Sequence, residues 1–198
     1  MRKVLAILLL CLLFALPASA EVIDQAGLLT ADEATSHAQR AAEIKARYQS
    51  DVVIVTVENT GGQEVRYFAA DFYDNNGYGV GEGHDGVLLL LAMEERDWFL
   101  LTTGSAIDAF TDYGIETIGE DILPYLSDGE YANAFARFLR DADAFLAQAE
   151  TGAPYDVDNP AVLTPAWARA LEYAPVVLVV AAVIAGLVVA YFIFAMRT

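Results

Sequence analysis

The chain has 198 residues and a formal net charge of −17. All 28 acidic residues but only eight of the 11 basic residues fall between Glu21 and Glu172, so this stretch carries a net charge of −20. Such a balance argues against nucleic-acid binding, which needs Lys and Arg on phosphates, and against adhesion to anionic lipid. The only cysteine, Cys11, lies in the N-terminal apolar segment, so the acidic stretch has no disulfide, thiolate nucleophile or Cys-ligated zinc.

Residues 1–20 have the pattern of a secretory signal peptide. Arg2 and Lys3 are followed by an apolar run over residues 4–16, and then by Pro17 and the small-residue sequence ASA at 18–20. We expect cleavage after residue 20, with an uncleaved anchor as the alternative. Either way, the region that follows is expected outside the cytoplasm.

Residues 21–149 are expected to form one extracytoplasmic domain. Thr30 and Glu33 form a capping box that predicts a helix over residues 31–48. Apolar periodicity predicts strands at residues 51–58, 86–92 and 98–103 and further helices at 63–73, 112–122 (ending before Pro124) and 130–149. This order of elements predicts an α/β fold, a three-layer α/β/α sandwich with a small mixed sheet.

The C-terminal part predicts attachment to a membrane. Residues 150–173 are rich in Asp and Pro and are interpreted as a linker, whereas residues 174–195 form an uncharged apolar stretch long enough for a transmembrane helix. Arg197, in a tail of residues 196–198, places the C-terminus in the cytoplasm by the positive-inside rule. We therefore expect a single-pass membrane protein whose N-terminal domain is periplasmic or extracellular.

The predicted topology brings several carboxylates to one end of the sheet. A helical crossover makes the strands at 51–58 and 86–92 parallel, and the third strand returns antiparallel to the same end. The residues expected to converge there, with the Gly-rich loop 74–86, are Asp85, Asp112, Asp74, Asp108 and Asp51. Carboxylates and backbone carbonyls are calcium-type ligands, so calcium or another divalent cation is the predicted cofactor. The alternative is a solvated acidic loop whose glycines serve turns.

Several segments resemble the TPM domain family, the group of thylakoid-lumen, photosystem-repair and receptor-modulator domains. They are VIDQAGLLT at residues 22–30, DVVIVTV at 51–57 and HDGVLLLLA at 84–92, followed by Arg96, Gly104, Asp112, Pro124, Gly129 and Tyr131. The resemblance implies an α/β/α sandwich outside the cytoplasm, an association with calcium and, in the plant branch, acid phosphatase activity. Other members act as non-enzymatic partners of membrane complexes.

Three hypotheses follow. The first is a membrane-tethered accessory module that binds calcium near Asp85 and assists a membrane or envelope complex. The second is a metal-dependent acid phosphatase, with Asp85, Asp112 and Asp74 on the metal. Arg96, in the predicted turn between the second and third strands, is expected at the end of the sheet opposite these aspartates, which counts against a role in phosphate binding. The third is a structural interaction domain without a metal.

Overall fold

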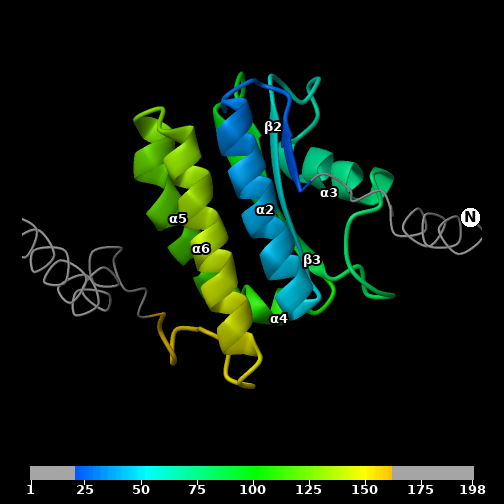
Figure 1. The fold of residues 1–198 in the computed structure, drawn as a ribbon, viewed down its shortest axis with the longest axis vertical. Coiled ribbons are helices and arrows are strands. Elements are labelled where there is room, and N and C mark those ends of the chain that lie inside the picture. The colour runs from blue at the N-terminus through cyan, green and yellow to red at the C-terminus, as the bar shows by residue number, and fades with distance from the viewer. Residues whose placement is uncertain (1–20, 162–198) are drawn as a thin grey trace, which may run out of the picture. The chain divides into compact units, whose positions relative to one another are not determined.

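The computed structural model describes residues 21–161, in which strands and helices alternate as far as β3, β4 follows directly and three helices end the domain (Figure 1). The elements are β1 (Val22–Asp24), α2 (Ala31–Tyr48), β2 (Asp51–Val57), α3 (Val65–Asn75), β3 (Gly86–Ala92), β4 (Asp97–Thr103), α4 (Ala106–Ala109), α5 (Asp112–Ser127) and α6 (Tyr131–Ala149).

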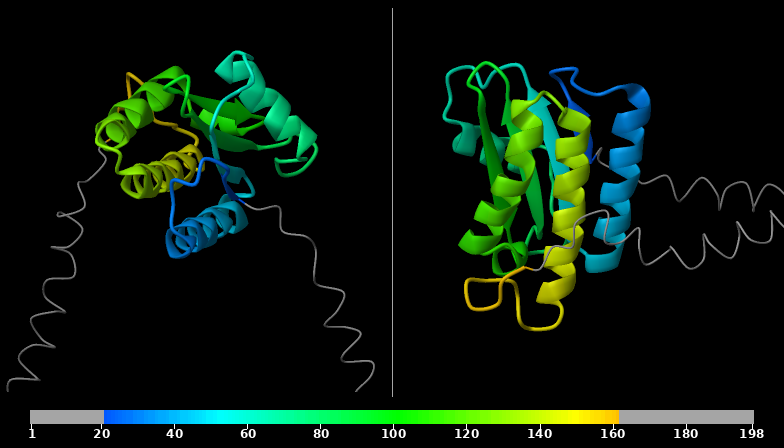
Figure 2. Two further views of the ribbon diagram at one scale, coloured as in Figure 1. Left: turned by 90° about the horizontal axis from the view of Figure 1, so that it is seen from above. Right: turned by 90° about the vertical axis from the view of Figure 1, so that its left-hand side faces the viewer.

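The four strands form one mixed sheet in the order β1-β2-β3-β4. β1, β2 and β3 are parallel to one another, and β4 is antiparallel to β3. Helix α3 covers one face, whereas α2, α5 and α6 lie on the other (Figure 2). Every residue of β2 and β3 is buried, as expected for strands covered on both faces. The predicted α/β sandwich with a small mixed sheet is confirmed for this part of the chain.

The predicted fold class also included a C-terminal transmembrane helix, and this part is corrected. Among residues 21–161, none of the helices combines the length and the apolar character that a membrane crossing requires. Those helices are amphipathic, because each covers the sheet with one face and meets solvent with the other. The apolar stretch at residues 174–195, and the predicted signal peptide at 1–20, lie outside the described residues.

Local signals correctly placed helix α2. The Thr30 backbone N–H donates to Glu33 Oε2 at 2.8 Å, and the Glu33 backbone N–H donates to Thr30 Oγ1 at 3.3 Å. This reciprocal capping box satisfies two N–H groups that the helix itself leaves without partners. The helix ends at Gln49, which adopts the left-handed conformation at φ 52° and donates its N–H to the Lys45 carbonyl oxygen.

Helix α5 shows where the local signals were wrong. It was expected to end before Pro124, yet it continues to Ser127 with the proline inside it. A proline removes only its own N–H from the helical ladder, and both Pro124 and Glu120, whose carbonyl would have accepted that bond, are exposed to water. The sequence analysis also missed β1 and α4, which have only three and four residues and so too little periodicity to detect.

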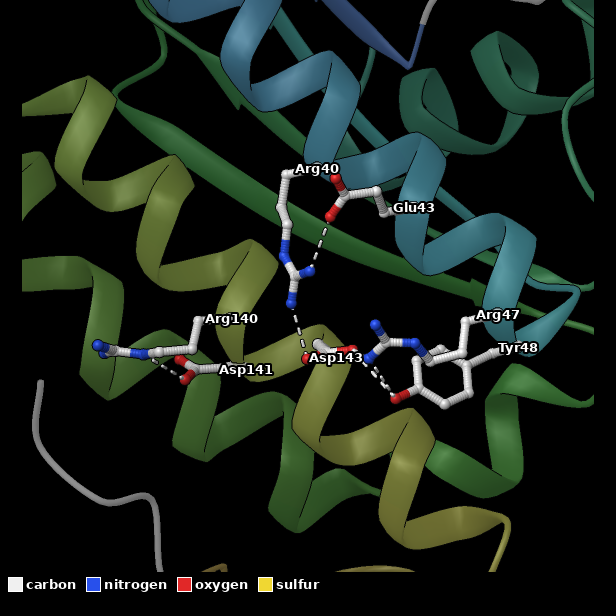
Figure 3. A network of polar contacts seen from close by, with 7 residues as sticks. All are labelled: Arg40, Glu43, Arg47, Tyr48, Arg140, Asp141 and Asp143. Atoms are coloured by element: carbon white, nitrogen blue, oxygen red, sulfur yellow. Dashed lines mark hydrogen bonds and ion pairs between the residues drawn. The ribbon is translucent and has the colours of Figure 1, made fainter. Parts of the chain in front are cut away.

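A polar network ties α2 to α6 (Figure 3). The Asp143 carboxylate on α6 accepts from Arg40 Nη2 at 2.7 Å, from Arg47 Nη1 at 3.1 Å and from Tyr48 Oη at 3.0 Å. Three donors from one helix converge on a single acceptor from the other, which fixes the register between the two helices.

Asp141, two residues before Asp143 on α6, points into the packed helical layer and is fully buried. Arg137 Nε donates to Asp141 Oδ2 at 2.7 Å, and the same guanidinium pairs with Asp121 of α5. Arg140 Nε lies 3.8 Å from Asp141 Oδ1 (Figure 3). Burial raises the pKa of Asp141 to about 6, although the bond from Arg137 acts in the opposite direction. The interior of the helical layer thus holds a carboxyl group that gains a proton more readily than an exposed aspartate.

The first part of the predicted linker packs on the domain. The Tyr155 ring contacts Phe145 edge-on with centroids 5.2 Å apart, and Thr111 Oγ1 donates to the Tyr155 carbonyl oxygen at 3.0 Å. Further along, the Ala161 N–H donates to Tyr113 Oη at 3.2 Å. Residues 151–161 therefore lie along the end of α6 and the start of α5.

Candidate functional site

The starts of β2 and β3 and the end of β4 lie side by side, because Asp51 is paired with Gly86 and Gly86 with Thr103. This register confirms the predicted meeting of the loops at residues 74–86 and 104–112. We call this end of the sheet the Asp85 edge, and we define it by Asp51, the loop 76–86 and residues 103–105.

Asp51 anchors the loop of the Asp85 edge to the sheet. Its side chain is buried, with one carboxylate oxygen 2.8 Å from Lys45 Nζ and the other accepting from the Gly79 N–H at 2.9 Å. Its backbone N–H donates to the Asp85 carbonyl oxygen at 2.9 Å. Because Lys45 and Gly79 already engage both oxygens, Asp51 has a structural role and is poorly placed to bind a cation.

Asp85 is held by backbone from two loops. Its Oδ1 accepts from the Ser105 N–H at 2.6 Å and lies directly against the Cα positions of Gly83 and Gly104. A Cβ at Gly104, where φ is +58°, would overlap Asp85 Oδ1 and lie 2.5 Å from the Gly83 carbonyl oxygen. Within residues 21–161, no hydrogen bond or ion pair engages Asp85 Oδ2. The carboxylate is thus fixed by one oxygen, and its other oxygen is not engaged by the part of the chain that the structure describes.

Tyr73 and Thr103 hold the backbone that leads into β3. Tyr73 Oη donates to the His84 carbonyl oxygen at 3.1 Å, and Thr103 Oγ1 donates to the same oxygen at 2.5 Å. His84 itself is left-handed, with φ 52°. Burial raises the pKa of Tyr73 to about 12, and the charges of Asp51, Asp85 and Asp74 add to the rise. The phenol therefore stays a hydrogen-bond donor at any physiological pH.

The other predicted ligands are more dispersed. Asp74 is exposed but close enough to affect the Tyr73 hydroxyl, whereas Asp108 and Asp112 are exposed on α4 and on the first turn of α5. Over the described part of the chain, no group of three or more His, Cys, Asp or Glu side chains is arranged to hold a metal ion. The structure brings Asp51 and Asp85 together with Asp74 nearby, and the metal site stays a prediction.

Sequence reasoning missed Lys45, Tyr73 and Ser105, which organise the edge. Lys45 lies in the last turn of α2, where a basic residue complements the helix dipole, and this signal was available. Tyr73 continued the apolar face of α3 and was indistinguishable from a core residue. Ser105 acts through its backbone N–H, which no side-chain pattern reveals.

Arg96 lies at the other end of the sheet, in the turn between β3 and β4, with φ 51°. The pairing of Ala92 with Asp97 closes that end, six residues from the pairing of Gly86 with Thr103. At roughly 3.3 Å per strand residue, the separation is about 20 Å. The predicted position is confirmed, and Arg96 is too far away to assist chemistry at Asp85.

Comparisons with known proteins agree with this architecture. Residues 22–145 match the TPM domain family. The UPF0603 protein YdjH of Bacillus subtilis (strain 168) is 26% identical over 119 residues, which are 60% of this chain and 45% of that protein. The chain thus matches about half the length of this relative.

Three solution structures share the fold. The N-terminal domain of a P. gingivalis protein aligns with a TM-score of 0.60 at 20% identity, over 70% of this chain and 88% of its own. The BA42 protein of Bizionia argentinensis aligns with a TM-score of 0.53 at 20% identity, over 68% and 90%. The N-terminal domain of cg2496 from Corynebacterium glutamicum aligns with a TM-score of 0.52 at 18% identity, over 64% of this chain and 80% of its own. At such identities these three likenesses concern the fold alone. The match to the family covers residues 22–145, which is more than half of the chain, and the chain therefore belongs to the TPM domain family.

Proposed function

We propose that this TPM domain is a non-enzymatic accessory module that binds a divalent cation, calcium foremost, at the Asp85 edge and assists a protein complex of the cell envelope. The observation that carries the proposal is the Asp85 carboxylate. The Ser105 N–H fixes one of its oxygens, and the other is not bonded by any residue between 21 and 161. A carboxylate held in this way loses little conformational freedom when it binds a cation.

The surrounding residues fit a hard cation with oxygen ligands. Calcium takes six to eight oxygens, and backbone carbonyls and water supply many of them in proteins. Asp85 Oδ2 is the proposed anchor, Asp74 is a second carboxylate nearby, and the Gly-rich loop 76–86 offers backbone oxygens. When bound, the cation would offset the charge gathered at this edge, where Lys45 pairs with Asp51 at 2.8 Å and is shared with Glu21 at 3.9 Å.

A metal-dependent phosphatase has less support from the geometry. In such an enzyme a basic group near the metal would help the metal to neutralise the charge of the phosphate. Arg96 is at the far end of the sheet, and Lys45, which does reach the Asp85 edge, is paired with Asp51 at 2.8 Å.

Calcium is expected to raise the melting temperature of the full-length protein after divalent ions have been removed with a chelator. For a site with a dissociation constant of about 10⁻⁴ M, calcium at 100 times that concentration stabilises by about 2.7 kcal/mol, which corresponds to a rise of roughly 5–10 °C. Magnesium at the same ionic strength should give a smaller rise, because it demands a more rigid octahedral site.

The variant Asp85→Asn should abolish the calcium-dependent rise, since it removes the charge that anchors the cation. Asp32→Asn, which changes an exposed aspartate on α2, is the matched control and should keep the rise. No rise with either ion, or a rise that persists in Asp85→Asn, would reject the proposal and favour an interaction domain without a metal. Equal rises that both vanish in Asp85→Asn would reject the preference for calcium.

A further inference from the structure

Among residues 21–161, no strand pairs with the outer edge of β4. The order β1-β2-β3-β4 makes β1 and β4 the edge strands, but β1 has three residues and β4 has seven. Proteins usually protect a long edge with a proline, a bulge or a lysine. β4 has none of these, because its sequence is DWFLLTT and its pairing with β3 runs without interruption from Asp97 to Thr103.

The pairing of β3 with β2 shows which backbone groups of β4 point away from β3. The Met93 N–H donates to the Val57 carbonyl oxygen at 3.1 Å, so the backbone groups of Met93 point toward β2. Because these groups alternate in direction along a strand, those of Ala92 point toward β4 and bond with its partner Asp97. By the same alternation, the backbone groups of Trp98, Leu100 and Thr102 face away from β3. The Trp98 N–H agrees with this, because it donates to its neighbour Asp97 Oδ1 at 2.9 Å.

The space beside this edge has a distinct chemistry on each face of the sheet. On the side of α5, a cleft of about 340 Å³ has an apolar floor that includes Trp98, Ile115 and Leu123. Leu123 is 44% exposed there. The rim of the cleft is acidic and comprises Asp112, Glu116 and Glu120. On the side of α3, the edge presents the partly buried apolar side chains Phe99 and Leu101.

We propose that the open edge of β4 binds an extended segment of a partner protein in which basic and apolar residues alternate. Such a segment would add a fifth strand, with its backbone bonded to Leu100 and Thr102 and to the carbonyl oxygen of Trp98. Side chains of a strand alternate between faces, so its Lys or Arg residues would lie over the cleft and reach Glu116 and Glu120. Its apolar residues would pack beside Phe99 and Leu101 on the other face.

Charge complementarity selects this occupant over a second copy of the chain. Two β4 strands paired edge to edge would bring two acidic rims near each other. The cleft lining contains three carboxylates and no basic residue, so a basic segment gains attraction where a second copy meets repulsion.

The test uses the full-length protein and the acetylated, amidated heptapeptide KVKVKVK, which matches β4 in length. We expect binding that slows hydrogen exchange of the Leu100 and Thr102 amides by about tenfold or more, while the Phe99 and Leu101 amides, already bonded to β3, change little. The same peptide N-methylated at every residue cannot donate to the edge in either strand orientation and should not bind. The acidic peptide EVEVEVE should not bind either.

Two protein variants separate the backbone and charge contributions. Thr102→Pro removes an outward N–H without breaking a bond to β3, and should abolish binding. Glu116→Gln with Glu120→Gln should weaken binding about fivefold at low salt. The control Glu58→Gln with Asp32→Asn, at exposed sites away from β4 and its cleft, should leave binding unchanged. No binding of KVKVKVK, binding of the N-methylated peptide, unchanged exchange at Leu100 and Thr102, or self-association through β4 would each overturn the proposal.

Discussion

Gly104→Ala is expected to lower the free energy of unfolding by about 3 kcal/mol. Gly104 has φ +58°, where a residue with a Cβ is disfavoured by roughly 1–2 kcal/mol. The new methyl group would also overlap Asp85 Oδ1 and crowd the Gly83 carbonyl oxygen, and displacement of packed groups typically costs 1–3 kcal/mol. Urea denaturation of the variant and the original protein measures the difference.

Gly129→Ala is the matched control for this prediction. Gly129 has a similar backbone, with φ +74°, but a Cβ there would meet nothing within 4 Å. We expect it to lose only the backbone contribution of roughly 1–2 kcal/mol. Equal losses in the two variants would show that Asp85 is not clamped as described, and that left-handed backbone alone requires glycine at position 104.

The variant Asp141→Asn is expected to gain stability relative to the original protein as the pH rises from 3 to 7. The pKa of Asp141 is raised from 3.8 to about 6 because the side chain is buried. Between these values the folded protein binds more protons than the unfolded chain, so the original protein loses stability as the pH rises through this window. Asparagine does not titrate, so the difference between the two proteins should change by about 3 kcal/mol.

Denaturation curves of both proteins at pH 3, 5 and 7 measure this effect. The contributions of groups that titrate alike in both proteins cancel in the difference between their free energies of unfolding. The carboxyl carbon of Asp141 in an NMR titration provides an independent reading and should show a midpoint near 6. A difference in stability that does not vary with pH, or a midpoint below 4, would mean that Arg137 outweighs the burial of the carboxylate.

Regular elements with strong local signals were predictable from the sequence. The Thr30 capping box placed the start of α2, and the apolar runs at β2 and β3 placed two buried strands. The crossover rule then predicts that Asp51, Gly86 and Thr103 lie at one end of the sheet, as they do. These successes rest on short-range chemistry and on a topological rule that is nearly universal.

The state of each carboxylate was not predictable in the same way. Asp51 and Asp85 look equivalent in the sequence, yet Lys45 neutralises the first and a backbone N–H fixes the second. These partners come from α2 and from the loop before α4, so they depend on packing between distant segments. The same holds for Asp141, whose burial between α5 and α6 gives it a pKa that its neighbours in sequence do not indicate.

The spatial order of the strands equals their order in the sequence, and this affects how the chain folds. Each strand pairs with the one made just before it, so the sheet can grow during synthesis without waiting for a later strand to insert. Helices α5 and α6 come last and cover the face on which α2 already lies. Until they arrive, that face of the nascent sheet is exposed, and the interval is the stage at which aggregation competes with folding.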